Sequence, residues 1–256
     1  MLVLSPSKGQ NFDQPASTAT YTQPIFLDQS EKLIRNLRGL NVEQLREKMH
    51  ISEKLAILNR ERYLSFQAPF TPQNAKQALY AFTGDVYTDI AVEQYTAEDL
   101  HFSQQHLRIL SGLYGCLRPL DLIQPYRLEM KTALETHRGK NLYRFWGNRV
   151  AKAITEAAQK SGSSVLFNLA SSEYYKVIKN KALQVPVLDI QFKDEKAGNL
   201  RIIAIFAKRA RGKMADFIIR NKITEPQQLQ AFTGHGYAFN QSLSTESRYV
   251  FTRQQP

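Results

Sequence analysis

The sequence predicts a mixed α/β fold in which the 256 residues form a single compact domain, with helices flanking a mixed sheet. Short apolar runs of strand length alternate with stretches of helical periodicity. A turn rich in charged residues and glycine joins two apolar runs late in the chain, as in a hairpin. We find no internal repeat and no linker that would divide the chain into separate domains.

The first half of the chain is predicted to be mostly helical behind one short strand. The apolar run MLVLS forms the strand, and a polar loop follows over residues 10–24. Ser52 is a suitable N-cap, Thr71 precedes a proline at a first helical position, and Thr96 begins a capping box. The helices expected before residue 96 cover residues 27–38, 42–48, 52–65 and 72–80.

Residues 104–130, QQHLRILSGLYGCLRPLDLIQPYRLEM, combine glycines, prolines, tyrosines and arginines in an unusual density. Ser103 is expected to cap a short helix that ends at Gly112. A Gly-x-x-Gly turn exposes backbone N–H groups, which suits contact with an anion such as phosphate. The candidate phosphate-binding residues in this block are Gly112, Tyr114, Gly115, Arg118 and Arg127.

The second half of the chain is predicted to supply most of the sheet. A basic amphipathic helix is expected near its middle and a short helix from Thr224. The strands are expected at residues 165–169, 185–192, 200–207 and 249–252, and the longer helices at 145–160 and 208–221.

The net charge of +11 lies in two blocks of the chain. Residues 118–152 carry +5 and residues 176–222 carry +8, whereas residues 1–117 carry −1. If both blocks face one side, they form a positive surface suited to a polyanion. The alternative is that they are solvated faces that serve only solubility.

Two turns carry candidate catalytic residues. Lys8 follows the first strand, and ligand sites tend to form at the carboxyl ends of strands in α/β sheets. It can bind phosphate or act as an amine nucleophile, although a solvated turn is the simpler interpretation. Asp85 follows a glycine turn, where it can cap a short helix, orient an arginine or act as a general base.

Further polar side chains gather at the end of the strand at 165–169 and on the basic helix. Asn168, Ser171 and Glu173 can cap the next helix or line a site, and these roles do not exclude each other. A cationic stripe on a helix is a common way to bind a phosphate backbone, and it is also a common solvated surface. Its members here are Lys208, Arg209, Arg211 and Lys213.

Other functional classes find no support in the sequence. Cys116 is the only cysteine, and the five histidines have no metal-ligand spacing, so we expect neither a disulfide nor a metal site. We find no cofactor-binding fingerprint, no apolar run long enough for a membrane span and no signal-peptide core, and expect a cytoplasmic protein.

Six motifs in this order resemble the bacterial YaaA peroxide-stress-resistance family. They are SPSK at 5–8, FTGDVYTDI at 82–90, the block at 104–130, FWG at 145–147, NLASSEYYK at 168–176 and AKRARGKMADFIIRN at 207–221. The resemblance covers essentially the whole chain.

The resemblance implies a cytoplasmic DNA-binding protein that limits peroxide damage to DNA and protein and is associated with lower free intracellular iron. It also implies an unusual α/β fold with a basic cleft and a helix-hairpin-helix-like element, which we place at LSGLYG. Double-stranded or structured DNA is the expected partner. The alternatives are an enzyme that acts on damaged DNA or a phosphorylated small molecule through Lys8 and a nearby carboxylate, and direct iron binding.

Overall fold

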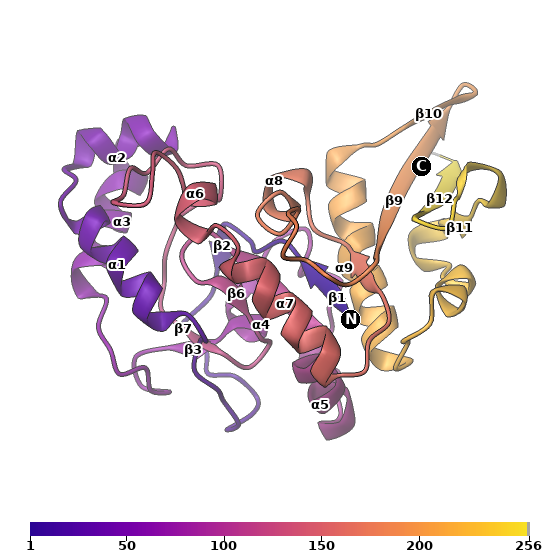
Figure 1. Cartoon of the computed structure of the whole chain (residues 1–256), viewed down its shortest axis with the longest axis horizontal. Helices are drawn as coiled ribbons and strands as arrows, with labels where there is room; N and C mark the ends of the chain where they lie inside the picture. The colour runs from indigo at the N-terminus through magenta and orange to yellow at the C-terminus, as the bar shows by residue number, and fades with distance from the viewer. Residues whose placement is uncertain (255–256) are drawn as a thin grey trace.

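The computed structural model describes residues 1–254 and contains an eight-stranded mixed sheet with helices around it (Figure 1). The strand order is β11-β12-β9-β8-β1-β5-β6, with β10 paired to β9. The strands are β1 (Leu2–Leu4), β5 (Leu107–Ser111), β6 (Gly115–Leu117), β8 (Leu166–Asn168), β9 (Val187–Lys196), β10 (Asn199–Arg201), β11 (Ala238–Phe239) and β12 (Arg248–Gln254).

The centre of the sheet is parallel and its margins are antiparallel. Strand β1 pairs in parallel with β5 and β8, and β9 pairs in parallel with β8 and β12. The antiparallel pairs are β5 with β6, β9 with β10, and β11 with β12. Two small ladders join β2 (Gly9–Gln10) to β4 (Phe82–Thr83) and β3 (Lys76–Gln77) to β7 (Leu122–Ile123).

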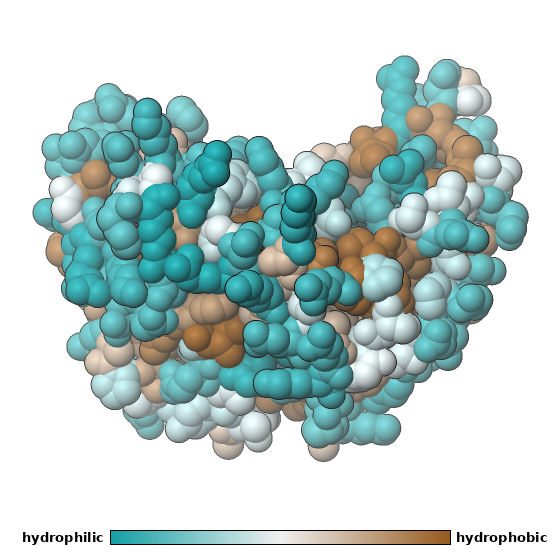
Figure 2. All heavy atoms as spheres, viewed as in Figure 1, coloured by the Kyte–Doolittle hydropathy of each residue, from teal (hydrophilic) through white to brown (hydrophobic). Residues whose placement is uncertain are grey.

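The helices lie in three parts of the view in Figure 1. Helices α1, α2 and α3 lie together at one side of the molecule, α9 lies near the C-terminal strands at the other, and α6, α7 and α8 lie between them. The surface is hollowed along its upper edge between these two sides (Figure 2). The helices are α1 (Leu27–Arg38), α2 (Val42–Met49), α3 (Glu53–Ser65), α4 (Ala78–Ala81), α5 (Ala97–His106), α6 (Leu142–Trp146), α7 (Arg149–Lys160), α8 (Ser172–Tyr175) and α9 (Ala204–Arg220).

Most predicted elements are confirmed. Helices α1, α2 and α3 begin and end within one residue of the predicted bounds, and Ser52 accepts a hydrogen bond from the Leu55 N–H as an N-cap. The capping box of Thr96 and Asp99 is present at the start of α5. The first strand, the strand at 165–169, the hairpin after β9 and the closing strand are also present.

Three other predicted elements have the wrong extent. The helix expected at 72–80 is reduced to α4, since residues 76–77 pair with β7 instead. The expected strand at 200–207 ends at Arg201, and α9 begins at Ala204. The helix expected at 145–160 is divided at Gly147, whose φ of 51° interrupts helical geometry.

The segment LSGLYG is a β-hairpin turn, and no helix-hairpin-helix element is formed there. Helix α5 ends at His106, and residues 107–111 form β5 between β1 and β6. All five residues of β5 are buried, so its apolar run reflects a central strand covered on both faces. A short apolar run does not by itself distinguish a strand from a buried helix.

None of the helices in residues 1–254 is long and apolar enough to cross a membrane.

Candidate functional site

A cavity of about 490 Å³ lies beyond the carboxyl ends of β1 and β8. From β1 the chain continues to β5 on one side of β1, and β8 returns on its other side. In open α/β sheets such a reversal of strand order leaves a crevice in which ligands bind. We call it the strand-end cavity, and its walls include residues 5–8, 84–86, 129–131, 169–174 and part of α9.

The strand-end cavity brings together five segments that are far apart in the sequence. All three candidate catalytic residues, Lys8, Asp85 and Glu173, line it. Its charged lining residues are the cations Lys8, Lys131, Lys208 and Arg211 and the carboxylates Asp85, Glu129 and Glu173.

Hydrogen bonds hold the loops of this cavity together. The Ser5 hydroxyl accepts from the Ser171 N–H at 2.8 Å and lies 3.3 Å from the Ser171 hydroxyl. The Tyr87 hydroxyl donates to the Ser5 carbonyl at 2.9 Å. Ser171 precedes α8 but makes no side-chain cap, so its hydroxyl serves the cavity wall and not the helix.

Close packing at Gly212 places α9 against the loop after Gly84. A Cβ atom at Gly212 would lie 1.8 Å from the Val86 carbonyl oxygen, so only glycine permits this approach. Lys208 and Arg211, on the preceding turn of the helix, thereby reach the cavity. Asp85 lies in a turn without a following helix and is 3.7 Å from the Lys208 amine, so the expected helix cap is not formed.

Glu129 connects three cations at the cavity. Its carboxylate lies 3.1 Å from the Lys8 amine, 3.2 Å from the Arg127 guanidinium and 3.6 Å from the Lys131 amine. Burial opposes its ionisation, but Lys8, Arg127 and Lys131 outweigh burial and hold the pKa of Glu129 below its usual range. Lys8 is 60% exposed, so this arrangement favours an anion anchor over a desolvated amine nucleophile.

Arg211 is the cation at this cavity without a carboxylate partner. No acidic side chain of residues 1–254 lies within 4.0 Å of its guanidinium, and its buried Nε has no hydrogen-bond partner there. Burial lowers the pKa of Arg211, and Asp189 opposes the shift. A guanidinium in this state is suited to a phosphate, with which it forms charge-assisted, bidentate hydrogen bonds.

Several predicted phosphate-binding residues lie away from this cavity. Gly112, Tyr114 and Gly115 are buried in the hairpin between β5 and β6, where their packing serves the core. A Cβ at Gly112 would lie 2.2 Å from the Leu128 carbonyl oxygen, and one at Gly115 would lie 2.7 Å from Trp146. These three residues therefore offer no surface to a phosphate.

The remaining predicted residues have partners of their own. Arg118 pairs with Asp121 at 2.9 Å and lines a different cavity from Lys8. Arg209 pairs with Asp89 at 3.2 Å and Lys213 with Asp216 at 3.7 Å. Asn168 is buried and donates to Asp189 at 3.0 Å, and Arg127 contacts the site through Glu129.

The sequence reasoning missed Ser5, Glu129 and Lys131. The signal was present, because Glu129 and Lys131 alternate with apolar residues at the end of the 104–130 block and just beyond it. Only the fold shows that this segment lies beside the end of the first strand.

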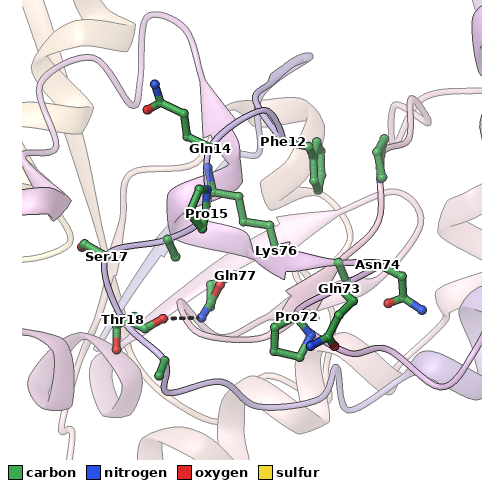
Figure 3. Close-up of a pocket in the computed structure, with 14 residues that line it drawn as sticks. Phe12, Gln14, Pro15, Ser17, Thr18, Pro72, Gln73, Asn74, Lys76 and Gln77 are labelled. Carbon is green, nitrogen blue, oxygen red and sulfur yellow. Dashed lines mark hydrogen bonds between the residues drawn. The ribbon is translucent and has the colours of Figure 1, made fainter.

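A second crevice, of about 540 Å³, lies between the loops at residues 12–19 and 72–77 (Figure 3). The Gln77 amide donates to the Thr18 carbonyl at 3.0 Å, and the Lys76 amine donates to the Asn11 carbonyl at 3.1 Å. The Lys76 and Gln77 side chains therefore already bind the backbone. We assign the candidate site to the strand-end cavity, where charged side chains converge.

Comparison with known proteins identifies relatives over nearly the whole chain. The family model described as "Peroxide stress protein YaaA" matches residues 1–243. A protein of Cellvibrio japonicus (strain Ueda107) named "UPF0246 protein" is 48% identical over 254 residues, which cover 99% of this chain and 98% of that protein.

Proposed function

The chain belongs to the YaaA peroxide stress protein family, and we propose that it acts in peroxide stress by binding DNA at the strand-end cavity. The observation that carries this proposal is that Arg211 lines the cavity without a carboxylate partner among residues 1–254. A DNA phosphate supplies the missing anion. The cytoplasm is the compartment that we propose for this function.

Both basic blocks of the sequence contribute cations to the cavity, which supports the proposal. Lys131 comes from the first block, and Lys208 and Arg211 come from the second, and all three line the same cavity as Lys8. Lys8 and Lys208 are 60% and 53% exposed and each lies beside one carboxylate. Exposed ion pairs contribute little stability, so these amines can exchange a carboxylate for a phosphate at small cost.

Double-stranded or structured DNA is the proposed partner, and fluorescence anisotropy tests the proposal. A labelled duplex, a bulged duplex and a single strand are titrated with the protein across a salt series. We expect an affinity that falls steeply with salt, because phosphate contacts release counterions. Weak binding that is equal for all three DNAs and insensitive to salt would overturn the proposal.

A second candidate function is catalysis on damaged DNA or on a phosphorylated small molecule. The observation in its favour is that Asp85, Glu129 and Glu173 line the same cavity as Lys8. A Schiff-base mechanism would leave a borohydride-trapped adduct on abasic DNA that Lys8→Ala abolishes. If borohydride traps nothing with the wild-type protein, the Schiff-base mechanism is rejected and DNA binding alone stands.

The lowering of free iron implied by the family resemblance is a separate proposal. Across residues 1–254 no group of three His, Cys, Asp or Glu side chains is placed to hold a metal ion. Titration of the protein with Fe²⁺ under anaerobic conditions distinguishes direct binding from an effect through other molecules. Saturable binding would support a direct role, and its absence would direct attention to other molecules.

A further inference from the structure

We propose that a cavity beside β6, separate from the strand-end cavity, binds a small phosphate-bearing molecule. This cavity of about 520 Å³ is formed by the end of α5, the β5–β6 hairpin and the second half of α7. Arg108 is the second residue of β5, so the cavity lies towards the amino end of that parallel strand. In Figure 1 α5 and the C-terminal end of α7 lie in the lower part of the molecule and α8 in the upper part. We call it the β6 cavity.

Arg108 is the central cation of the β6 cavity. It is 9% exposed, and its Nη1 donates to the Gln104 and Leu107 carbonyls at 2.9 and 2.7 Å. No carboxylate in the described part of the chain forms an ion pair with it. A buried charge without a counterion is costly, and an anion in the cavity relieves that cost.

Arg118 is held rigidly at the wall of the same cavity. Its Nε donates to Asp121 at 3.0 Å, and its Nη2 donates to the Gln23 carbonyl at 2.9 Å. Asp121 is fully buried and does not line the cavity, so it fixes the guanidinium from behind. Lys160 adds a third cation, at the exposed end of α7.

The positive charge of Arg108 acts on titratable groups beside it. Burial, together with the positive charge of Arg108, lowers the pKa of the Met1 amine to about 5. Burial also lowers the pKa of His106 to about 4, together with the N-terminal amine and Arg108. Burial raises the pKa of Cys116 to about 12, so this lining thiol adds no negative charge at neutral pH.

The remaining lining residues favour a small phosphorylated molecule. The three cations face one carboxylate, that of Glu156. Ser161 and two glutamines supply hydrogen-bonding groups, while Ile25, Ala153 and Ala157 supply an apolar wall for an organic part. The volume is within the range of small-molecule sites, and an arginine this deeply buried is more accessible to a compact anion than to a duplex.

Isothermal titration calorimetry at low salt, with pyrophosphate and AMP as probes, tests the proposal. We expect saturable binding that weakens about tenfold or more in Arg108→Met, because hydrogen bonds to charged groups are lost. Lys160→Met changes an exposed residue and leaves the fold intact, and should weaken binding about twofold to fivefold. Arg60→Met, at an exposed position on α3, is the matched control and should bind as wild type.

Three results would overturn the proposal. The first is no binding of either probe by the wild-type protein. The second is unchanged affinity in both Arg108→Met and Lys160→Met, which would place the anion elsewhere. The third is displacement of pyrophosphate by a short DNA duplex in wild type but not in Arg211→Met, which would make the β6 cavity part of the DNA surface.

Discussion

The strand-end cavity and the β5–β6 hairpin both contain residues that the sequence marks as candidate binding residues, yet only the cavity presents its side chains to a ligand. The hairpin carries Gly112 and Gly115 because neighbouring backbone and Trp146 leave no room for a Cβ. The charged residues of the cavity come from loops and from α9, and their side chains line its walls. An unusual density of glycine, proline and aromatic residues can therefore mark a crowded core as readily as a binding site.

The largest effect expected from this comparison is a loss of stability in Gly112→Ala. The new Cβ would meet the Leu128 carbonyl oxygen at 2.2 Å, and this backbone atom cannot move independently. We expect about 3 kcal/mol or more of destabilisation in urea unfolding. Gly198→Ala is the control for a glycine with open space around it: nothing lies within 4 Å of a Cβ there, and only its φ of 75° opposes the change, which should cost about 1 kcal/mol. Equal losses in both variants would contradict the packing role.

Glu129→Gln should lower the stability of the protein and yet strengthen DNA binding at the strand-end cavity. The variant loses the interactions with Lys8, Arg127 and Lys131, and we expect about 2 kcal/mol of destabilisation at pH 7. Because the folded pKa of Glu129 is lowered, its contribution is present above the unfolded value of about 4.3 and disappears as pH falls through the folded pKa. We expect the free energies of unfolding of the two proteins, measured in urea between pH 3 and 7, to converge as the pH falls below the ordinary glutamate pKa of about 4.3.

The same variant should bind DNA about twofold to fivefold more tightly, since Lys8 and Lys131 lose their competing carboxylate. Anisotropy at one low salt concentration measures this. Weaker binding in Glu129→Gln, with the fold intact by circular dichroism, would show that the carboxylate orders the site for DNA.

The smallest effect is expected at Cys116. Its buried thiol has a pKa of about 12, and the thiolate is the form that reacts. Hydrogen peroxide and iodoacetamide should leave the native protein unmodified at pH 7 by mass spectrometry, and should modify it after unfolding in urea. Rapid oxidation of the native thiol would contradict the structure and would point to a peroxide-sensing cysteine.

Much of the fold could be predicted because its local signals are strong. Ser52, Thr96 and Asp99 fix helix starts by hydrogen bonds within three residues, so their pattern is visible in the sequence. The run at 107–111 is a strand and not the expected helix, because its pairing depends on β1, more than a hundred residues away, and on β6, beyond a turn.

The sequence predicts individual residues of the candidate site, but not which of them lie together. Lys8, Asp85, Glu173, Lys208 and Arg211 were identified from strand ends and a basic helix, and the structure brings them together. Arg209 and Lys213 have the same chemistry on the same helix but pair with acidic residues outside the cavity. Helical periodicity places the two pairs on different faces of α9, but only the packing of Gly212 against Val86 determines which face meets the cavity.

The salt dependence of DNA binding by two double variants shows whether the DNA lies at the strand-end cavity. Lys208→Met with Arg211→Met removes two cavity cations, whereas Arg209→Met with Lys213→Met removes the same number of charges from the same helix outside the cavity. We predict that the slope of log affinity against log salt falls by nearly 2 in the first variant, at about 0.9 per phosphate contact, and changes little in the second. Equal changes in both variants, or no change in the first, would contradict DNA binding at the strand-end cavity.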